Sequence, residues 1–152
     1  MLSTTLKSCL NWSIWYDAPM NLYEVISKLS PDLEQSPIIN ALWLEGSWAT
    51  GKNNHESDID VWMDVEDGKF AESIDIFRTA LERIGKIDWE DSRGVYSENP
   101  KLQKHTFHLE GFPLKQRIEL DLQEHSRKFV FNKDEHIIMV IFDKNNSINW
   151  NT

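Results

Sequence analysis

The sequence predicts an α+β domain in which a mixed β-sheet carries helices on one face. Two segments in the first half of the chain place apolar residues at helical spacing. Other segments alternate apolar and polar residues, which is the pattern of half-buried strands, and these dominate the second half. Strands and helices in this order indicate a sheet covered by helices on one side.

Residues 21–29 and 69–84 are the predicted helices. We expect the first to stop before Pro31, because the residue that precedes a proline disfavours helical geometry. A further helical turn is expected at 32–35. The second has one apolar stripe and is closed by Gly85. The stripe consists of Phe70, Ile74, Phe77, Leu81 and Ile84.

Six segments are predicted to be strands. They are residues 38–45, 58–65, 87–89, 104–109, 117–122 and 136–142. A polar loop at 50–57 follows the first strand, and residues 111–113 form a hairpin connection between the fourth and fifth. The third strand is short and leads into a loop that reaches residue 102. The tail from Asp143 is polar, and we expect turns there.

The length of 152 residues predicts a single domain that spans 1–152. No apolar run approaches the roughly 20 residues that span a bilayer. Residues 1–10 carry one lysine and no sustained apolar stretch, so they do not resemble a signal peptide. Cys9 is the only cysteine, which excludes an internal disulfide and favours a reducing, cytoplasmic setting.

The charge balance restricts the class of partner. The chain has 25 acidic and 16 basic side chains, for a net charge of −9. Duplex DNA and structured RNA are bound mainly through neutralising lysines and arginines, so bulk nucleic acid is not expected as a partner. Metal ions, a cationic small molecule or a basic protein suit this charge better.

The chemistry-bearing segment begins where the first strand ends, at Gly46 and Ser47. A glycine permits a tight turn and close approach to a ligand, and Ser47 offers a hydroxyl near a predicted helix start, which suits a phosphate. Asp58 and Asp60 then share one face of a strand, about 6.5–7 Å apart. Their carboxylates can converge on two ions about 3.5–4 Å apart, and Mg²⁺ suits such a site.

Two carboxylates rarely hold two hard cations, so a third is expected from another strand. Glu119 and Asp121 project together from one face of the strand at 117–122. We favour Asp121, with Glu119 as the alternative. The competing interpretation is that Asp58, Asp60 and Asp121 form only the wet face of half-buried strands.

The histidines add little to this set. His105 and His108 are three residues apart on an alternating strand, so they face opposite sides and do not form a two-histidine metal site. Three side chains remain open as general base toward an acceptor hydroxyl: His125, Asp121 and Glu124.

Seven tryptophans are many for this length. Trp43, Trp62 and Trp89 are expected to fill core or half-buried positions. The alternative is that some of them line an acceptor cleft and stack on a sugar or a base.

Together, Gly46-Ser47, the ten-residue spacing, the Asp58-x-Asp60 pair and the later acidic strand resemble the DNA polymerase β-type nucleotidyltransferase superfamily. This group includes aminoglycoside and lincosamide nucleotidyltransferases, protein adenylyltransferases and small antitoxins of toxin–antitoxin pairs. The matching motifs cover residues 41–65 and 117–122. The resemblance implies the nucleotidyltransferase fold and transfer of a nucleotidyl group, with ATP as the expected donor, to an acceptor hydroxyl.

The resemblance also implies roles for individual residues. Gly46 and Ser47 would contact the triphosphate, Asp58 and Asp60 would bind two Mg²⁺ ions, and Asp121 would complete the site. The chain departs from the pattern at Trp48, where a basic residue is frequent, and at Glu45, where an apolar residue is usual. We expect Lys52 to supply the missing positive charge.

The acceptor expected from the resemblance is a small molecule such as an aminoglycoside-type compound. The alternative is a minimal antitoxin that binds and adenylylates a partner toxin. A non-catalytic nucleotide binder is a third reading, against which the intact Asp58 and Asp60 argue. Residues 137–142 are similar to the end of the catalytic domain of aminoglycoside adenylyltransferases, where a helical acceptor-binding domain usually follows. The site is therefore either minimal or completed by another chain.

Overall fold

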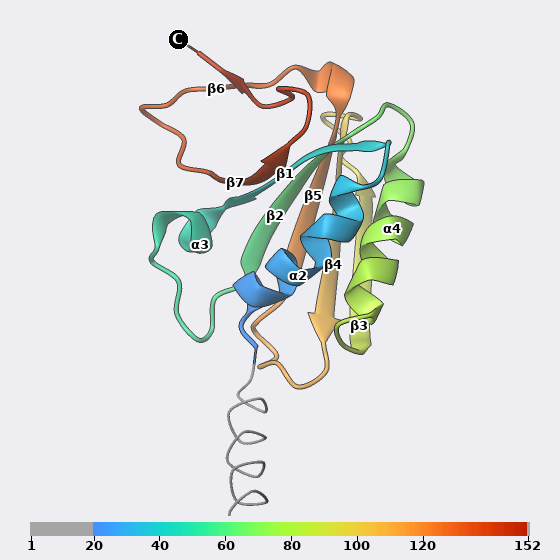
Figure 1. Cartoon of the computed structure of the whole chain (residues 1–152), viewed down its shortest axis with the longest axis vertical. Coiled ribbons are helices and arrows are strands. Elements are labelled where there is room, and N and C mark those ends of the chain that lie inside the picture. The colour runs from blue at the N-terminus through green and yellow to red at the C-terminus, as the bar shows by residue number, and fades with distance from the viewer. Residues whose placement is uncertain (1–19, 152) are drawn as a thin grey trace, which may run out of the picture.

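The structure is a computed structural model that describes residues 20–151. The predictions for residues 1–10 and for Cys9 lie outside this range. A six-stranded mixed sheet carries the helices α2 (Leu22–Glu34) and α4 (Phe70–Glu82) on one face (Figure 1). This confirms the predicted α+β class with helices on one side of the sheet. None of the helices in the described residues is long and apolar enough to cross a membrane.

Two shorter helical elements and eight strands complete the described residues. The short elements are α3 (Gly46–Thr50) and the 3-10 turn η1 (His125–Arg127). The strands are β1 (Ile39–Glu45), β2 (Ile59–Val65), β3 (Ile87–Val95), β4 (Leu102–Leu109), β5 (Ile118–Glu124), β6 (Val130–Phe131), β7 (Met139–Asp143) and β8 (Asn149–Trp150).

The strand order of the main sheet is β3-β4-β5-β2-β1-β7. β2 and β5 run parallel at the centre, and all other neighbours are antiparallel. Parallel strands need a crossover, and α4 with the β3-β4 hairpin provides it between β2 and β5. Two central strands therefore point the same way, and residues from distant parts of the chain meet side by side on them.

The main core lies between the sheet and the two long helices. Alternate residues of β2, namely Ile59, Val61 and Met63, are fully buried there against the apolar stripes of α2 and α4. Because successive strand residues point to opposite faces, the polar residues of β2 and β5 lie on the face that α2 and α4 leave open.

A second, smaller cluster covers part of this open face. Phe131 and Ile148, from the C-terminal segment, pack with Ala41 and Trp43 of β1. The tail beyond Asp143 is therefore not merely turn-like, as predicted, because it contains β8, which pairs with β6. The sequence gives little indication of β8, because the strand has only two residues. The one apolar neighbour that is buried is Ile148, which is 6% exposed.

The prediction that Pro31 ends the first helix is wrong, because α2 continues to Glu34. A proline has no N–H to donate to the carbonyl four residues earlier. The Ser30 hydroxyl donates to that carbonyl, on Ser27, at 3.0 Å. The missing bond is thus replaced locally, and the buried side chains Leu29 and Leu33 stay on the same face of one helix.

Most predicted strand boundaries lie within two residues of the observed ones, and two differ by more. β3 extends to Val95 rather than ending at residue 89, although its outer half is polar and exposed. Hydrogen bonds to β4 hold this outer half in the sheet. Because the strand has no buried face there, its sequence shows no apolar alternation from which the strand could have been predicted. The last strand begins at Met139 rather than at residue 136. His136 instead belongs to a turn, where its ring nitrogen accepts a hydrogen bond from the Asn132 N–H.

Candidate functional site

Three carboxylates lie side by side on the open face of the sheet. The strand register pairs Glu45 of β1 with Asp60 of β2, and Asp60 with Glu119 of β5. Neighbouring strands are about 4.8 Å apart, so these three side chains form a row across the sheet. We call Glu45, Asp60 and Glu119 the carboxylate row.

Asp121, the predicted third carboxylate, lies on the same face but beside the row. Its register partner on β2 is Trp62, whereas the partner of Asp60 is Glu119. Asp121 is 7% exposed and accepts a hydrogen bond from the Tyr96 hydroxyl at 3.2 Å. The structure thus brings both acidic residues of β5 close to Asp60, with Glu119 directly opposite.

The glycine–serine turn lies against the carboxylate row. Gly46 has a φ of +68°, and a Cβ at this position would collide with a carboxylate oxygen of Asp60. Both the positive φ and the close approach to Asp60 require a glycine at this position. Ser47 follows in α3, and its carbonyl accepts the backbone N–H of Lys52 at 2.9 Å. Ser47 is therefore adjacent to the row, while Lys52 is exposed on the loop that follows α3.

Basic side chains engage the outer carboxylates of this face. Asp58, just before β2, accepts the backbone N–H of Arg117 at 2.7 Å and its guanidinium at 3.2 Å. Lys104 of β4 donates to Glu119 at 3.1 Å. Within residues 20–151, no group of three or more His, Cys, Asp or Glu side chains is placed to hold a metal ion. Asp58 and Glu119 are instead ion-paired with Arg117 and Lys104.

Asp60 and Asp121 lie where the charged form of a carboxylate is disfavoured. Burial, together with the hydrogen bond and charge of Glu119, raises the pKa of Asp60 to about 7. Burial raises the pKa of Asp121 to about 6, against the lowering effect of Lys104. Burial also acts to raise the pKa of Glu119, but its bond to Lys104 outweighs burial and the net pKa is lowered. One ammonium thus compensates the cluster only in part.

The chemistry of these side chains suits a hard divalent cation, although within residues 20–151 they are not arranged as a ligand set. Carboxylate oxygens are the ligands that Mg²⁺ prefers. Burial is the main cause of the raised pKa of Asp60 and the charge of Glu119 adds to it, so a neighbouring cation would favour the ionised carboxylate. Asp58 precedes β2, Asp60 is its second residue, and Glu119 and Asp121 lie on the adjacent strand. The chemistry of these four side chains is therefore suited to cation binding.

The three candidate general bases are not equally placed. His125 bonds Asp64 at 3.0 Å, and Asp64 is four residues, or about 13 Å, along β2 from Asp60. Glu124 accepts the backbone N–H of Gly68 at 2.9 Å, at the turn before α4. Of the three, only Asp121 lies next to the carboxylate row.

Asp64 is a polar residue on this face of the sheet that is not exposed to solvent. It is 1% exposed and accepts hydrogen bonds from Asn40 and Gln123 at 3.0 and 2.9 Å. Its bonds, including the one to His125, connect β1, β2 and β5. Asp64 is therefore a structural group at the far end of the row's face.

The two histidines of β4 have separate surroundings. His105 is buried beside Phe107 on the helix-covered face, and its ring nitrogens have no hydrogen-bond partner. His108 contacts Asp88 at 2.7 Å and the carbonyls of Phe112 and Pro113. The two rings do not form a common site.

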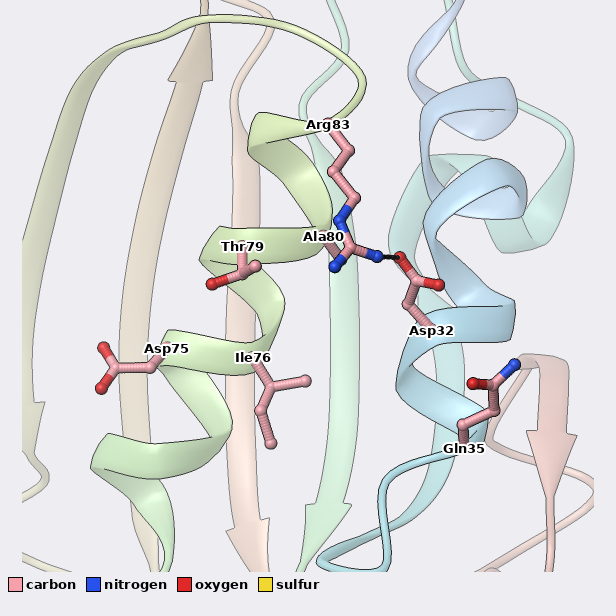
Figure 2. A pocket seen from close by; sticks show the side chains of 7 residues that line it. All are labelled: Asp32, Gln35, Asp75, Ile76, Thr79, Ala80 and Arg83. Atoms are coloured by element: carbon pink, nitrogen blue, oxygen red, sulfur yellow. Dashed lines mark hydrogen bonds and ion pairs between the residues drawn. The ribbon is translucent and has the colours of Figure 1, made fainter.

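A groove on the opposite side of the molecule carries no such chemistry. It lies between α2 and α4, where Arg83 and Asp32 form an ion pair at 2.9 Å (Figure 2). The remaining lining residues are Gln35, Asp75, Ile76, Thr79 and Ala80. None of them is among the predicted site residues, and the sheet separates this groove from the carboxylate row.

Lys104, Tyr96 and Glu45 belong to this site and were not predicted as site residues. Alternation in the sequence places Lys104 on one face of its strand, but the pairing with β5 that brings it to Glu119 is not visible there. In the sequence, Glu45 was noted only because the superfamily pattern usually has an apolar residue before the glycine. Its position immediately before Gly46 is the one signal that would have placed it near the row.

Comparisons with known proteins identify the family and a similar fold. The sequence matches the nucleotidyltransferase domain family over residues 26–128. The fold is similar to that of an aminoglycoside 6-adenyltransferase from Bacillus subtilis, with a TM-score of 0.52 and 15% identity over 88% of this chain. The chain covers 45% of that protein, so it spans less than half of its length. No curated protein matches the sequence.

Proposed function

We propose, from the premise that this chain belongs to the nucleotidyltransferase domain family, that it transfers a nucleotidyl group from a nucleoside triphosphate to an acceptor hydroxyl. ATP is the expected donor, so the group transferred is AMP. One observation carries this proposal: Gly46 packs on Asp60, which lies opposite Glu119. The turn expected to bind phosphate and the carboxylates expected to bind cations are therefore neighbours.

Asp58, Asp60 and Asp121 are the side chains that we assign to two Mg²⁺ ions, with Glu119 as an additional ligand beside Asp60. When bound, the ions would neutralise phosphate charge and stabilise the entering and leaving oxygens. Asp58 must exchange its contact with Arg117 for this role. The freed guanidinium is then available to a phosphate oxygen, which it can bind through two N–H groups.

The reaction forms one bond and breaks one. The acceptor oxygen attacks the α-phosphorus, the bond from this phosphorus to the bridging α–β oxygen breaks, and pyrophosphate leaves. We assign the hydroxyl proton to Asp121, because Lys104 already pairs with Glu119 and because His125 and Glu124 are engaged elsewhere. A base must lie within hydrogen-bond reach of the proton that it takes.

The triphosphate is assigned to Gly46, Ser47 and Lys52. Gly46 lies against Asp60 and lets the backbone approach a ligand closely, and the next residue, Ser47, offers a hydroxyl. Lys52 is exposed, and its backbone is tied to Ser47, so its ammonium is free to turn toward the same region. This supports the expectation that Lys52 supplies the charge absent at Trp48.

The acceptor is a separate question from the donor. The likeness to an aminoglycoside 6-adenyltransferase supports a small polyhydroxylated amine, of the aminoglycoside type, as the first candidate. The net charge of −9 also suits a cationic acceptor. A basic partner protein, such as a toxin, would satisfy the same charge argument.

The test is incubation of the chain with labelled ATP, GTP, CTP or UTP and Mg²⁺ over a panel of acceptors. The proposal predicts labelled product and released pyrophosphate, both absent in Asp60→Asn. Label on an aminoglycoside would support the small-molecule acceptor, and label on a co-purified protein would support the alternative. Product formation that is unchanged in Asp60→Asn would refute the assignment.

A further inference from the structure

A small aromatic pocket lies between the open face of the sheet and the C-terminal segment. Its volume is about 160 Å³. Trp43 and Trp62 form one side, stacked at 5.9 Å between centroids with 16° between their planes. Phe129 and Phe131 form the other, in an edge-to-face pair at 4.9 Å. The pocket is thus walled by flat apolar rings.

The Arg127 guanidinium, the His136 ring and Glu45 complete the lining. The Arg127 guanidinium carbon lies 4.5 Å from the ring centroid of Phe129 and 5.8 Å from that of Trp62. Its Nη1 donates to Gln123 at 2.8 Å, which fixes the orientation of the group. A planar cation held against aromatic rings is a stacking surface for a planar ligand.

The pocket is continuous with the carboxylate row. Glu45 lines the pocket and is also the β1 member of the row. Trp62 is two residues, or about 6.6 Å, along β2 from Asp60. A ligand whose α-phosphorus lies at Asp60 therefore has the pocket within reach of the nucleoside that the phosphorus carries.

We infer that this pocket binds the base of the nucleoside triphosphate, and that the base is a purine with an amino group. The inference rests on the proposed function and deepens it. Pockets for drug-sized ligands measure roughly 300–1,000 Å³, so this one accommodates a single ring system and not a whole nucleotide.

The polar groups of the pocket give the preference for an amino group. Glu45 accepts the indole N–H of Trp43 through one oxygen at 3.2 Å. A carboxylate has further lone pairs and donates nothing, so it favours a base that offers N–H groups. Adenine, guanine and cytosine carry an amino group, whereas uracil offers one ring N–H between two carbonyls that a carboxylate would repel. The size of the ring system separates the two purines from cytosine. The larger purine face also stacks more extensively on Arg127 and Trp62.

The experiment is calorimetric titration of the full chain, with Mg²⁺, using non-hydrolysable analogues of ATP, GTP and UTP. Inorganic tripolyphosphate serves as the ligand without a base. We expect the purine analogues to bind about tenfold more tightly than either the UTP analogue or tripolyphosphate, the size expected for one stacked base. Trp62→Leu and Arg127→Met should remove that difference and leave tripolyphosphate affinity unchanged.

Two further variants make the result specific. Arg127→Lys keeps the charge but loses the planar face, so it should lose the purine preference as Arg127→Met does. Trp89→Leu removes an exposed tryptophan outside the pocket and should retain the preference. Circular dichroism establishes that each variant is folded.

The outcomes separate the inference from the proposed function. Equal affinity of the wild-type chain for purine analogues and tripolyphosphate would overturn the base pocket while supporting the phosphate site. A purine preference that survives in folded Trp62→Leu and Arg127→Met would also overturn it. Failure of every ligand to bind would overturn the proposed function, and the base pocket with it.

Discussion

The Asp60 carboxylate occupies the space that a side chain at position 46 would need, and Gly46 is held there with a φ of +68°. Gly46→Ala should therefore lose nucleotide binding and transfer. We expect a loss of unfolding free energy of about 2–4 kcal/mol, from the left-handed backbone and from displacement of Asp60. Denaturant unfolding and calorimetric titration with an ATP analogue measure the two effects.

Gly94→Ala is the matched control. Gly94 has the same φ of +68°, but a Cβ there would meet nothing within 4 Å. It should cost only the backbone contribution of about 1–2 kcal/mol and leave transfer intact. Equal losses of stability and activity in the two variants would show that contact with Asp60 plays no part.

Asp58→Asn and Asp60→Asn should each reduce transfer by at least about 10³-fold, because each removes a charged cation ligand. The fold should persist, since both side chains lie on the open face and not in the main core. In the absence of divalent ions, Asp60→Asn should be no less stable than the wild type, because it removes a buried charge and its repulsion with Glu119.

Asp75→Asn, on α4 and far from the row, is the control for these variants and should retain full activity. Rates of pyrophosphate release and thermal unfolding in EDTA provide the comparison. Substantial transfer by Asp58→Asn or Asp60→Asn would remove these residues from the catalytic assignment.

Lys52→Ala should weaken binding of an ATP analogue about fivefold, the effect of losing one charge-assisted contact to phosphate. Lys28→Ala, an exposed lysine on α2, is the matched control. The dissociation constants of the two variants and the wild type are the measurement. Unchanged affinity in Lys52→Ala would count against its role.

The sequence was sufficient to predict where the structure places those parts of the candidate site that depend on short-range patterns. The alternation along residues 58–65 indicated that Asp58 and Asp60 share one face. The glycine after β1 indicated a tight turn and a close approach to a ligand. Both follow from residues within about fifteen positions of one another, where backbone geometry leaves few choices.

The choice between Glu119 and Asp121 could not be made in this way. Alternation states that both share a face of β5, but not which of them stands opposite Asp60. That register is fixed by how Leu120 and Leu122 pack in the core, across nearly sixty residues of intervening chain. The positions of Lys104 and Tyr96 depend on the same long-range pairing.

Local rules failed where tertiary packing overrode them. Pro31 predicted the end of a helix. However, α2 continues through it, because burial of Leu29 and Leu33 on one face stabilises a single helix. The part of β3 beyond Trp89 and the two-residue β8 carry too few apolar residues to be recognised, and pairing with β4 and β6 holds them in place.

The buried ring of His105 should make stability depend on pH. Burial lowers its pKa from 6.5, so below that pH the unfolded chain binds a proton that the folded chain resists. This contribution to stability is complete above about pH 6.5 and is lost as the pH falls through the lowered folded-state pKa. His105→Leu should flatten the acid side of the unfolding free energy measured between pH 7 and pH 5.

His108 contributes with the opposite sign. Burial acts to lower its pKa, but the bonds to Asp88 and to the carbonyls of Pro113 and Phe112 outweigh it and raise the pKa above 6.5. Its stabilisation is complete below pH 6.5 and is lost as the pH rises through the raised value.

For the His105→Leu prediction, an unfolding free energy that falls equally steeply toward acid pH in wild type and His105→Leu would contradict the assignment to His105.

The central claim is that Asp58, Asp60 and the β5 carboxylates form a cation site beside the glycine–serine turn. Its most direct test is Mn²⁺ binding in the presence of a non-hydrolysable ATP analogue, followed by electron paramagnetic resonance. We expect two bound ions per wild-type chain, and loss of at least one in Asp60→Asn. The same Mn²⁺ stoichiometry and affinity in wild type and Asp60→Asn would contradict the claim.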